Sequence, residues 1–267
     1  MVSFVATPIG NLKDITFRAI ETLKEADVIF CEDTRHTIKL LNAYEIKKPL
    51  YACHKFNEKE AAEKILAAAR EGKNVAVVSD AGTPVVSDPG NLVCKALKEA
   101  GQPYTLIPGA CAFVAALVLS ALPADKFAFI GFLPEKKSEK AALLSAYKDL
   151  DMTLAFHCAP QDVDKDVAAM YEVFGERRAC AVREITKIHE ESVEFFLSQG
   201  LEGEKRGEYV LLVEGAKKAE NPLNGLSEIE HIRYYMEQGL DKKEALKRAA
   251  KDRGVSKSDL YPFAIGL

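Results

Sequence analysis

The chain has 267 residues, a length that indicates two compact domains. Of these residues 48% are apolar and 28% charged, a composition typical of a folded protein and not of a disordered chain. No apolar run approaches the roughly 18 residues of a membrane-spanning helix, and we expect no secretory signal at the N-terminus. The net charge of −4 excludes a generic nucleic-acid coat, so any contact with RNA must be local.

The first 120 residues alternate short apolar runs with amphipathic runs. Strands are expected at 2–6, 28–31, 75–78 and 104–107, and helices at 17–26, 37–44, 57–71, 91–100 and 112–119. Asn57 and Glu60 have the spacing of a capping box at the start of one helix. This alternation predicts a mostly parallel sheet that helices cover on both faces.

The second half begins after a short break at 120–125. Strands are expected at 127–132, 153–156, 179–183 and 209–213, and helices at 138–150, capped by Ser138, 163–174 and 193–199. A polar stretch at 216–225 resembles a tether, and two or three short helices are expected from 227 to 261. We therefore expect two α/β domains, 1–120 and 121–215, and a tether with a small helical extension at 216–267.

The six cysteines and five histidines form no paired-ligand pattern. No two cysteines have C-x-x-C spacing, and most lie in apolar stretches, as buried free thiols of a reducing cytoplasm do. We therefore expect a cytoplasmic location and no metal site.

Four loops directly follow the expected strands of the first domain, at 6–12, 32–37, 79–90 and 108–112. They are rich in Gly, Pro, Asp and small residues, which is also the composition of ordinary turns. Because the carboxyl ends of parallel strands line the ligand crevice of an open sheet, four such loops predict one ligand site. The loops match neither a P-loop nor a dinucleotide-binding motif.

Two groups of charged residues are candidates for contact with phosphate. The first lies at 183–191 and contains Arg183, Glu184 and Lys187; it is either a solvated strand end or a cluster that binds phosphate and handles protons. The second lies between Gly239 and Lys257, with seven Lys and Arg against three Asp and Glu at helical spacings. It is either a solvated helix face or a contact to the RNA backbone.

Seven motifs in order resemble the ribosomal RNA small-subunit methyltransferase I family of the tetrapyrrole-methylase-like superfamily, from residue 2 to about 215. They are T-P-I-G-N-L at 7–12, E-D-T-R-H-T at 32–37, S-D-A-G-T-P-x-x-S-D-P-G at 79–90, I-P-G at 107–109, G-F-L-P at 131–134, R-E-I-T-K-x-H-E-E at 183–191 and V-E-G at 213–215.

The resemblance implies a class III methyltransferase fold, with S-adenosylmethionine in the cleft between two α/β domains, and a homodimer. Members of this group methylate the ribose 2′-oxygen of a cytidine in the decoding region of 16S rRNA, and we expect the substrate to be the 30S subunit. The match places these residues at the cofactor: Pro8, Asp80, Ala81, Gly82, Thr83, Val86, Ser87, Asp88, Cys111 and Ala112.

The remaining site residues are assigned by charge type and motif. Lys187, with a lowered pKa, or Glu184 is the expected proton acceptor, and Asp33 is expected to orient the ribose or the base. Substrate RNA is expected to contact Arg35, His36 and Arg183.

Two segments depart from the family pattern. Residues 156–161 read F-H-C-A-P-Q where the group carries a Y-E-S-P-H-R-like segment, and we expect this change on the substrate side. Ala121 stands where a glycine is usual. The first change leaves open a methyltransferase of the superfamily that acts on a tetrapyrrole or another small molecule. A further alternative, of another class, is a non-catalytic RNA-binding factor of ribosome assembly.

Overall fold

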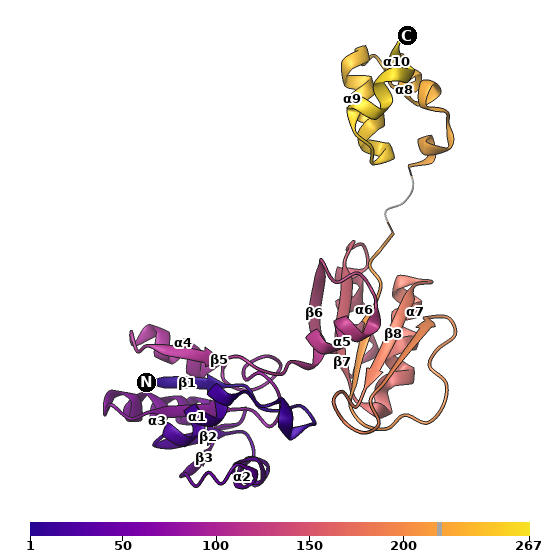
Figure 1. Ribbon diagram of the computed structural model, residues 1–267. Coiled ribbons are helices and arrows are strands. Elements are labelled where there is room, and N and C mark those ends of the chain that lie inside the picture. Colours follow the sequence, from indigo (N-terminus) through magenta and orange to yellow (C-terminus); the bar gives the residue numbers. More distant parts are fainter. Residues whose placement is uncertain (218–220) are drawn as a thin grey trace. The chain divides into compact units, whose positions relative to one another are not determined.

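A computed structural model describes residues 1–217 and 221–267 of the chain (Figure 1). Internal contacts divide it into two compact units, Met1–Ala216 and Lys217–Leu267. The first unit holds two five-stranded sheets, and the second is helical.

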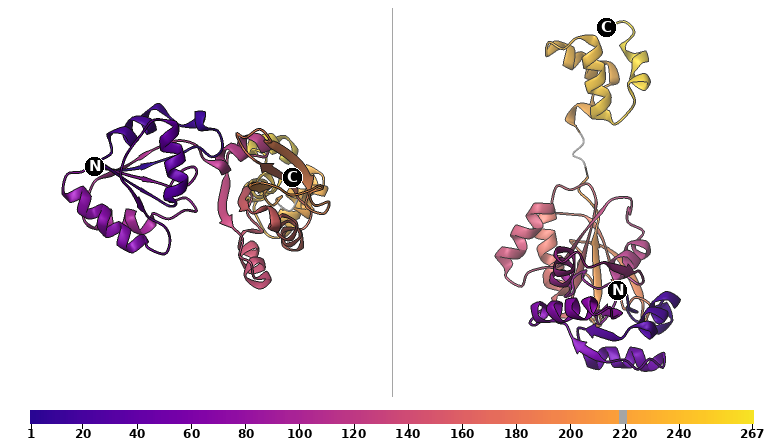
Figure 2. Two further views of the ribbon diagram at one scale, coloured as in Figure 1. Left: turned by 90° about the horizontal axis from the view of Figure 1, so that it is seen from below. Right: turned by 90° about the vertical axis from the view of Figure 1, so that its left-hand side faces the viewer.

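The first sheet is entirely parallel, in the order β3-β2-β4-β1-β5. Its strands are β1 (Val2–Val5), β2 (Val28–Cys31), β3 (Leu50–Ala52), β4 (Val75–Val78) and β5 (Tyr104–Ile107). Its helices are α1 (Phe17–Glu25), α2 (Thr34–Ala43), α3 (Glu58–Arg70) and α4 (Asn91–Glu99), and a short 3₁₀ turn, η1 (Leu12–Asp14), follows β1. Figure 2 (left) shows helices on both sides of these strands.

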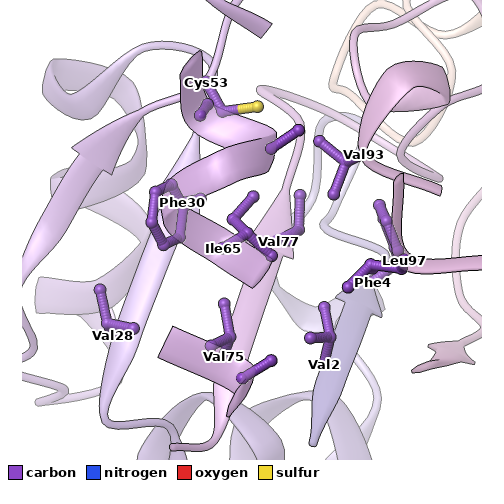
Figure 3. Packing of buried hydrophobic residues seen from close by; sticks show 13 residues of the cluster. Val2, Phe4, Val28, Phe30, Cys53, Ile65, Val75, Val77, Val93 and Leu97 are labelled. Carbon is purple, nitrogen blue, oxygen red and sulfur yellow. The ribbon is translucent and has the colours of Figure 1, made fainter. Parts of the chain in front are cut away.

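Both faces of the three central strands β1, β2 and β4 are buried, as their continuous apolar runs predict, whereas the edge strands β3 and β5 are largely exposed. Strand side chains such as Phe4, Phe30 and Val77 pack against Ile65 of α3 and Leu97 of α4 (Figure 3). The opposite face packs on α1 and α2. Replacing a fully buried side chain such as Ile65 by alanine costs about 2–5 kcal/mol in such a core.

The second sheet is mixed, in the order β6-β7-β10-β8-β9. Its strands are β6 (Phe127–Phe132), β7 (Thr153–Cys158), β8 (Arg178–Arg183), β9 (Glu191–Phe196) and β10 (Tyr209–Val213). Only β6 and β7 run parallel to each other, and the other three pairings are antiparallel. Helices α6 (Lys137–Tyr147) and α7 (Val163–Phe174) pack on one face, with a 3₁₀ turn, η2 (Pro160–Asp162), before α7.

Helix α5 (Ala112–Ser120) follows the last strand of the first sheet but packs on the second. Its buried Ala116 and Leu117 contact Ala155, Cys180 and Leu212 on the face opposite α6 and α7. The helix ends at Ala121, which has a left-handed backbone conformation with φ of 53°. Such a φ favours glycine, the residue that the resemblance led us to expect at this position.

Three expectations about local structure are wrong, and one strand was not predicted. The helix predicted at 193–199 is the edge strand β9, because its Val193 and Phe195 alternate with more exposed residues and pair with β8. The short strand β3 was not predicted, since three residues carry too little periodicity. Asn57 makes no capping bond to α3, because its side chain instead bonds His54 and Ala52. Ser138 lies inside α6, which begins at Lys137.

The second unit is made of a 3₁₀ turn, η3 (Pro222–Gly225), and helices α8 (Glu228–Glu237), α9 (Lys242–Arg253) and α10 (Lys257–Ala264). Ile232, Leu246 and Leu260, one from each helix, meet in a core of its own. Within the described part of the chain, no helix is both long and apolar enough to cross a membrane.

Candidate active site

A cavity of about 390 Å³ lies in the first unit, between loops of the first sheet and strand ends of the second. This volume is within the usual range of small-molecule sites, roughly 300–1,000 Å³. The first sheet and the start of α5 contribute Ile9, Asp80, Ala81, Gly82, Thr83, Val86, Ser87, Asp88, Cys111, Ala112 and Phe113. The second sheet and its loops contribute Phe132, His157, Cys158, Ala159, Pro160, Ile185, Glu208, Tyr209 and Val210.

The loop after β4 forms most of the first wall and is tied to the loops around it. Gly82 exchanges two backbone hydrogen bonds with Thr7, of 2.9 and 3.1 Å, which joins the loops after β1 and β4. Asp80 Oδ1 accepts from the backbone N–H of Asp33 at 3.0 Å, and the Thr83 hydroxyl donates to the carbonyl of Ala110 at 3.1 Å. All four predicted loops therefore meet at one edge of the sheet.

Gly82 takes part in this bridge with a φ of +78°, and a Cβ there would lie 3.2 Å from the Ile9 side chain. Two other residues of this loop, Val85 and Ser87, are not glycine but also have positive φ values, of 76° and 65°. A β-branched residue in this region is strained, and such strain gathers at functional sites.

Acidic groups give the first wall a negative character. The pKa of Asp88 is raised because the carboxyl is buried, and the charge of Asp80 adds to this effect although a hydrogen bond from Ser79 opposes it. The pKa of Glu32, at the end of β2, is also raised by burial and by these two neighbours. This part of the cavity can stabilise a positively charged ligand group.

His157 stands on the opposite wall, in ring contact with two phenylalanines. Its ring centroid lies 5.0 Å from that of Phe129 and 5.3 Å from that of Phe132. Burial lowers the pKa of His157, and the charge of Glu208 only partly compensates. The imidazole is therefore neutral at pH 7 and adds no positive charge to the cavity.

Behind this wall lies a buried ion pair, Lys140 with Asp166, whose side chains are 9% and 6% exposed. The Cys158 thiol donates to Asp166 Oδ2 at 3.3 Å. Burial and the carboxylate of Asp166 raise the pKa of Cys158, so the thiol that lines the cavity stays protonated. This network fixes the end of β7 against α6 and α7.

Lys187 is engaged by two carboxylates at the edge of the second sheet. Its Nζ lies 2.9 Å from Glu184 Oε1 and 3.3 Å from Glu208 Oε2. Burial by itself lowers the pKa of Lys187, but these carboxylates outweigh it and raise the pKa above the usual value. The predicted lowering of this pKa is therefore wrong, because sequence could not show that two anions face the ammonium group.

Gly10 brings the first sheet close to this cluster. A Cβ at Gly10 would lie 2.6 Å from Lys187 Cγ and 2.8 Å from the carbonyl of Ile185. The next residue, Asn11, donates its backbone N–H to Thr186 Oγ1 at 3.0 Å. The loop after β1 thus contacts the end of β8 without a side chain between them.

The structure brings nine of the ten predicted cofactor residues to the cavity, and Pro8 is the one that is not in its lining. The predicted proton acceptors and RNA contacts, Lys187, Glu184, Asp33, Arg35, His36 and Arg183, do not belong to the lining. Asp33 caps α2, and the guanidinium of Arg35 lowers the pKa of its carboxyl to about 2. Arg183 pairs with Glu191 at 2.6 Å.

The residues of the second wall were not predicted as site residues. The departing segment 156–161, expected on the substrate side, supplies His157, Cys158, Ala159 and Pro160 to the same cavity as the predicted cofactor residues. Its disagreement with the family motif was the only signal in the sequence. Within the described residues no group of three His, Cys, Asp or Glu side chains is placed to hold a metal ion.

The chain is similar to proteins of known family. Residues 1–199 match the model of the tetrapyrrole (corrin/porphyrin) methylases. The chain is 41% identical to ribosomal RNA small subunit methyltransferase I of Bacillus subtilis, over 96% of this chain and 91% of that protein. It is 42% identical to the protein of that name from Halalkalibacterium halodurans, over 96% and 92%.

A solved structure has the same fold: uroporphyrin-III C-methyltransferase of Thermus thermophilus, complexed with S-adenosyl homocysteine. Its TM-score is 0.57, at 19% identity, with 80% of this chain and 96% of that chain covered. Together with the two sheets and the cavity between them, these matches confirm the predicted fold class. The chain belongs to the tetrapyrrole methylase family of S-adenosylmethionine-dependent methyltransferases, in the group of ribosomal RNA small subunit methyltransferase I.

Proposed function

We propose that this methyltransferase transfers the methyl group of S-adenosylmethionine to the ribose 2′-oxygen of a cytidine in the decoding region of 16S rRNA. The observation that carries the proposal is the cavity between the two sheets, which nine of the residues expected at the cofactor line. The two relatives at 41% and 42% identity, both named for ribosomal RNA of the small subunit, support the acceptor.

The residues of the cavity fit the cofactor. Small residues at Ala81, Gly82 and Ala112 leave room for an extended ligand, and apolar Val86 and Phe113 can pack on an adenine ring. The carboxylates of Asp80 and Asp88 on the same wall favour a cationic sulfonium. S-adenosylmethionine supplies an already activated methyl group when bound, so the chain's own task is positioning.

In the reaction, the 2′-oxygen forms a bond to the methyl carbon as the bond from that carbon to sulfur breaks, and the hydroxyl proton leaves to a base or to water. Lys187, Glu184 and Asp33 stay proposals for this acceptor. Lys187 is protonated and paired, and partner cations lower the pKa values of Glu184 and Asp33, which makes both carboxylates weak bases. Positioning is thus expected to supply most of the rate.

Contacts to the substrate RNA are proposed for Arg35, His36 and Arg183. The Arg35 side chain is 88% exposed beside its partner Asp33, so a phosphate can reach the guanidinium. His36 is exposed on the next position of α2. The Arg183 side chain is 27% exposed beside its partner Glu191, so part of it reaches the surface.

We also propose that the protein acts in the cytoplasm as a homodimer on the assembled 30S subunit. The exposed face of α5 supports dimerisation, because Val114, Val118 and Leu119 are 46%, 77% and 39% exposed on a helix without charged residues. Val118→Glu should convert a dimer to a monomer in light scattering, and an unchanged dimer would place the interface elsewhere.

The test of function is methyl transfer from labelled S-adenosylmethionine to small ribosomal subunits from cells that lack this protein. Digestion and mass spectrometry should find 2′-O-methylcytidine in the decoding region of 16S rRNA. Label at another nucleotide would correct the position. No label, with cofactor binding intact in calorimetry, would refute the RNA acceptor.

One observation favours a second candidate, a methyltransferase for a tetrapyrrole or another small molecule. His157 and Cys158, in the segment that departs from the group's motif, line the cavity itself. In that case tetrapyrrole substrates would accept label and ribosomal subunits would not. Failure to bind S-adenosylmethionine at millimolar concentration would favour the non-catalytic assembly factor.

A further inference from the structure

The solvent face of α9 in the second unit carries a row of lysines. Lys243, Lys247 and Lys251 are spaced four residues apart, so they project from one side of the helix about 6 Å apart along its axis. All three are exposed, whereas Ala245, Leu246, Ala249 and Ala250 of the same helix are buried in the core. The row is thus fixed on one surface by the packing of the opposite side.

These lysines are not needed for the fold of the unit. The only ion pair recorded for them within the described residues joins Lys247 to Glu244 at 3.9 Å, too long for a good hydrogen bond. Arg253, in contrast, has partners within the unit, since its guanidinium donates to Glu228 at 3.2 Å and to His231 Nδ1 at 3.1 Å. Among residues 1–217 and 221–267, no closer ion pair engages the charge of the row.

The neighbouring helix adds features that suit a nucleic acid. A three-residue turn, with Gly254 in the left-handed region at a φ of 67°, leads from α9 into α10. On α10, Lys257 and Tyr261 lie one turn apart, and Tyr261 is 59% exposed. Phosphate contacts by lysine and base stacking on exposed tyrosine are both common in RNA recognition.

The rest of the chain is net negative, so a local cationic surface is needed to attract RNA. Residues 1–215 carry 26 Lys and Arg against 32 Asp and Glu, whereas Gly239 to Lys257 carry seven against three. A net negative first unit repels RNA at long range, so attraction must come from a local cationic face. A protein partner with an acidic surface would be the competing occupant, but the exposed Tyr261 beside Lys257 favours RNA.

We propose that the row Lys243, Lys247 and Lys251, with Lys257 and Tyr261 of α10, is an RNA-binding face that holds the substrate by its phosphate backbone. This inference rests on the proposed function, because it assumes an RNA acceptor. The face adds affinity and leaves the methyl-transfer step unchanged.

The test compares three full-length variants with the wild type. The variant Lys243→Glu/Lys247→Glu/Lys251→Glu reverses the charge of the row. A second variant, with arginine at the same three positions, keeps that charge. Lys59→Glu/Lys95→Glu/Lys98→Glu is the matched control, because it makes the same change in net charge on exposed positions of α3 and α4. Thermal unfolding checks that each variant folds.

The probes are a labelled RNA hairpin, protein-free 16S rRNA and intact small subunits. Reversal of the row should weaken binding to all three by at least about tenfold and lower the slope of log affinity against log salt by about 2–3, as expected for three lost phosphate contacts. The Arg variant and the control should bind like the wild type. S-adenosylmethionine binding should not change in any variant.

Equal affinity and equal salt slope for the reversed variant would overturn the proposal. Weakened binding to subunits with unchanged binding to both protein-free RNAs would also overturn it, because the face would then contact a ribosomal protein. Absence of methyl transfer by the wild type would refute the proposed function, and the RNA-binding measurements would still decide the role of this face.

Discussion

The two walls of the cavity are built in different ways. The wall from the first sheet consists of loops that leave parallel strands and are joined to one another by backbone bonds, such as those between Thr7 and Gly82. The wall from the second sheet consists of strand ends in a mixed sheet, fixed from behind by the buried Lys140–Asp166 pair. The first wall therefore depends on backbone conformation, and the second on buried charge.

The largest effect is expected from breaking the buried pair behind the second wall. Lys140→Met leaves the Asp166 carboxylate uncompensated, and we expect a loss of about 3–5 kcal/mol in the free energy of unfolding. Urea denaturation measures it. The double variant Lys140→Met/Asp166→Leu should recover most of this loss; if the single variant is as stable as the wild type, the pair does not support this wall.

A smaller effect, confined to the cofactor, is expected in the first wall. Gly82→Ala places a side chain at a φ of +78°, which costs about 1–2 kcal/mol and crowds Ile9, so S-adenosylmethionine affinity should fall about tenfold. Gly72→Ala is the matched control, since Gly72 has a φ of +81° with no atom within 4 Å of the added Cβ. Calorimetry should show loss of affinity for the first variant alone; equal losses would mean that strain acts through the whole sheet.

Lys187 connects the walls, because it contacts the loop after β1 at Gly10 and the carboxylate of Glu208 in the cavity lining. If its role is positioning, Lys187→Met should lower kcat by less than about tenfold and leave the pH profile of kcat unchanged. A proton acceptor would contribute about 10²–10⁴-fold. A loss of that size, with a missing limb in the pH profile, would restore Lys187 as the base.

The smallest effect concerns the charge of the second wall. The pKa of His157 is lowered in the folded chain, so between that pKa and the ordinary value near 6.5 the unfolded chain binds more protons. This histidine thus makes the folded state less stable as pH falls below about 6.5, by at most about 1.4 kcal/mol per pH unit. Between pH 7.5 and pH 5, the free energy of unfolding should fall less for His157→Phe than for the wild type, as denaturation at both pH values would measure. An equal fall in both proteins would show that the pKa of His157 does not change with folding.

The difference between the walls also explains what could be predicted. In the parallel sheet every strand ends at the same edge, so residues that follow strands, such as Asp80 and Cys111, identify the site from sequence. In the mixed sheet β10 runs antiparallel to β7 and β8, and it presents its beginning, Tyr209, to the cavity. A search for loops after strands therefore cannot find Glu208, Tyr209 or Val210.

The amino-acid sequence by itself determined the parallel sheet, the family and the loops of the first wall, because these depend on local periodicity and on short motifs. Only the tertiary structure decided that α5 packs on the second sheet, that His157 and Cys158 face the predicted cofactor residues, and that Lys187 lies between two carboxylates. Protonation and pairing depend on neighbours that are distant in the chain. For Lys187 they reversed the predicted direction of the pKa shift, since the charges that surround a side chain are set by the fold.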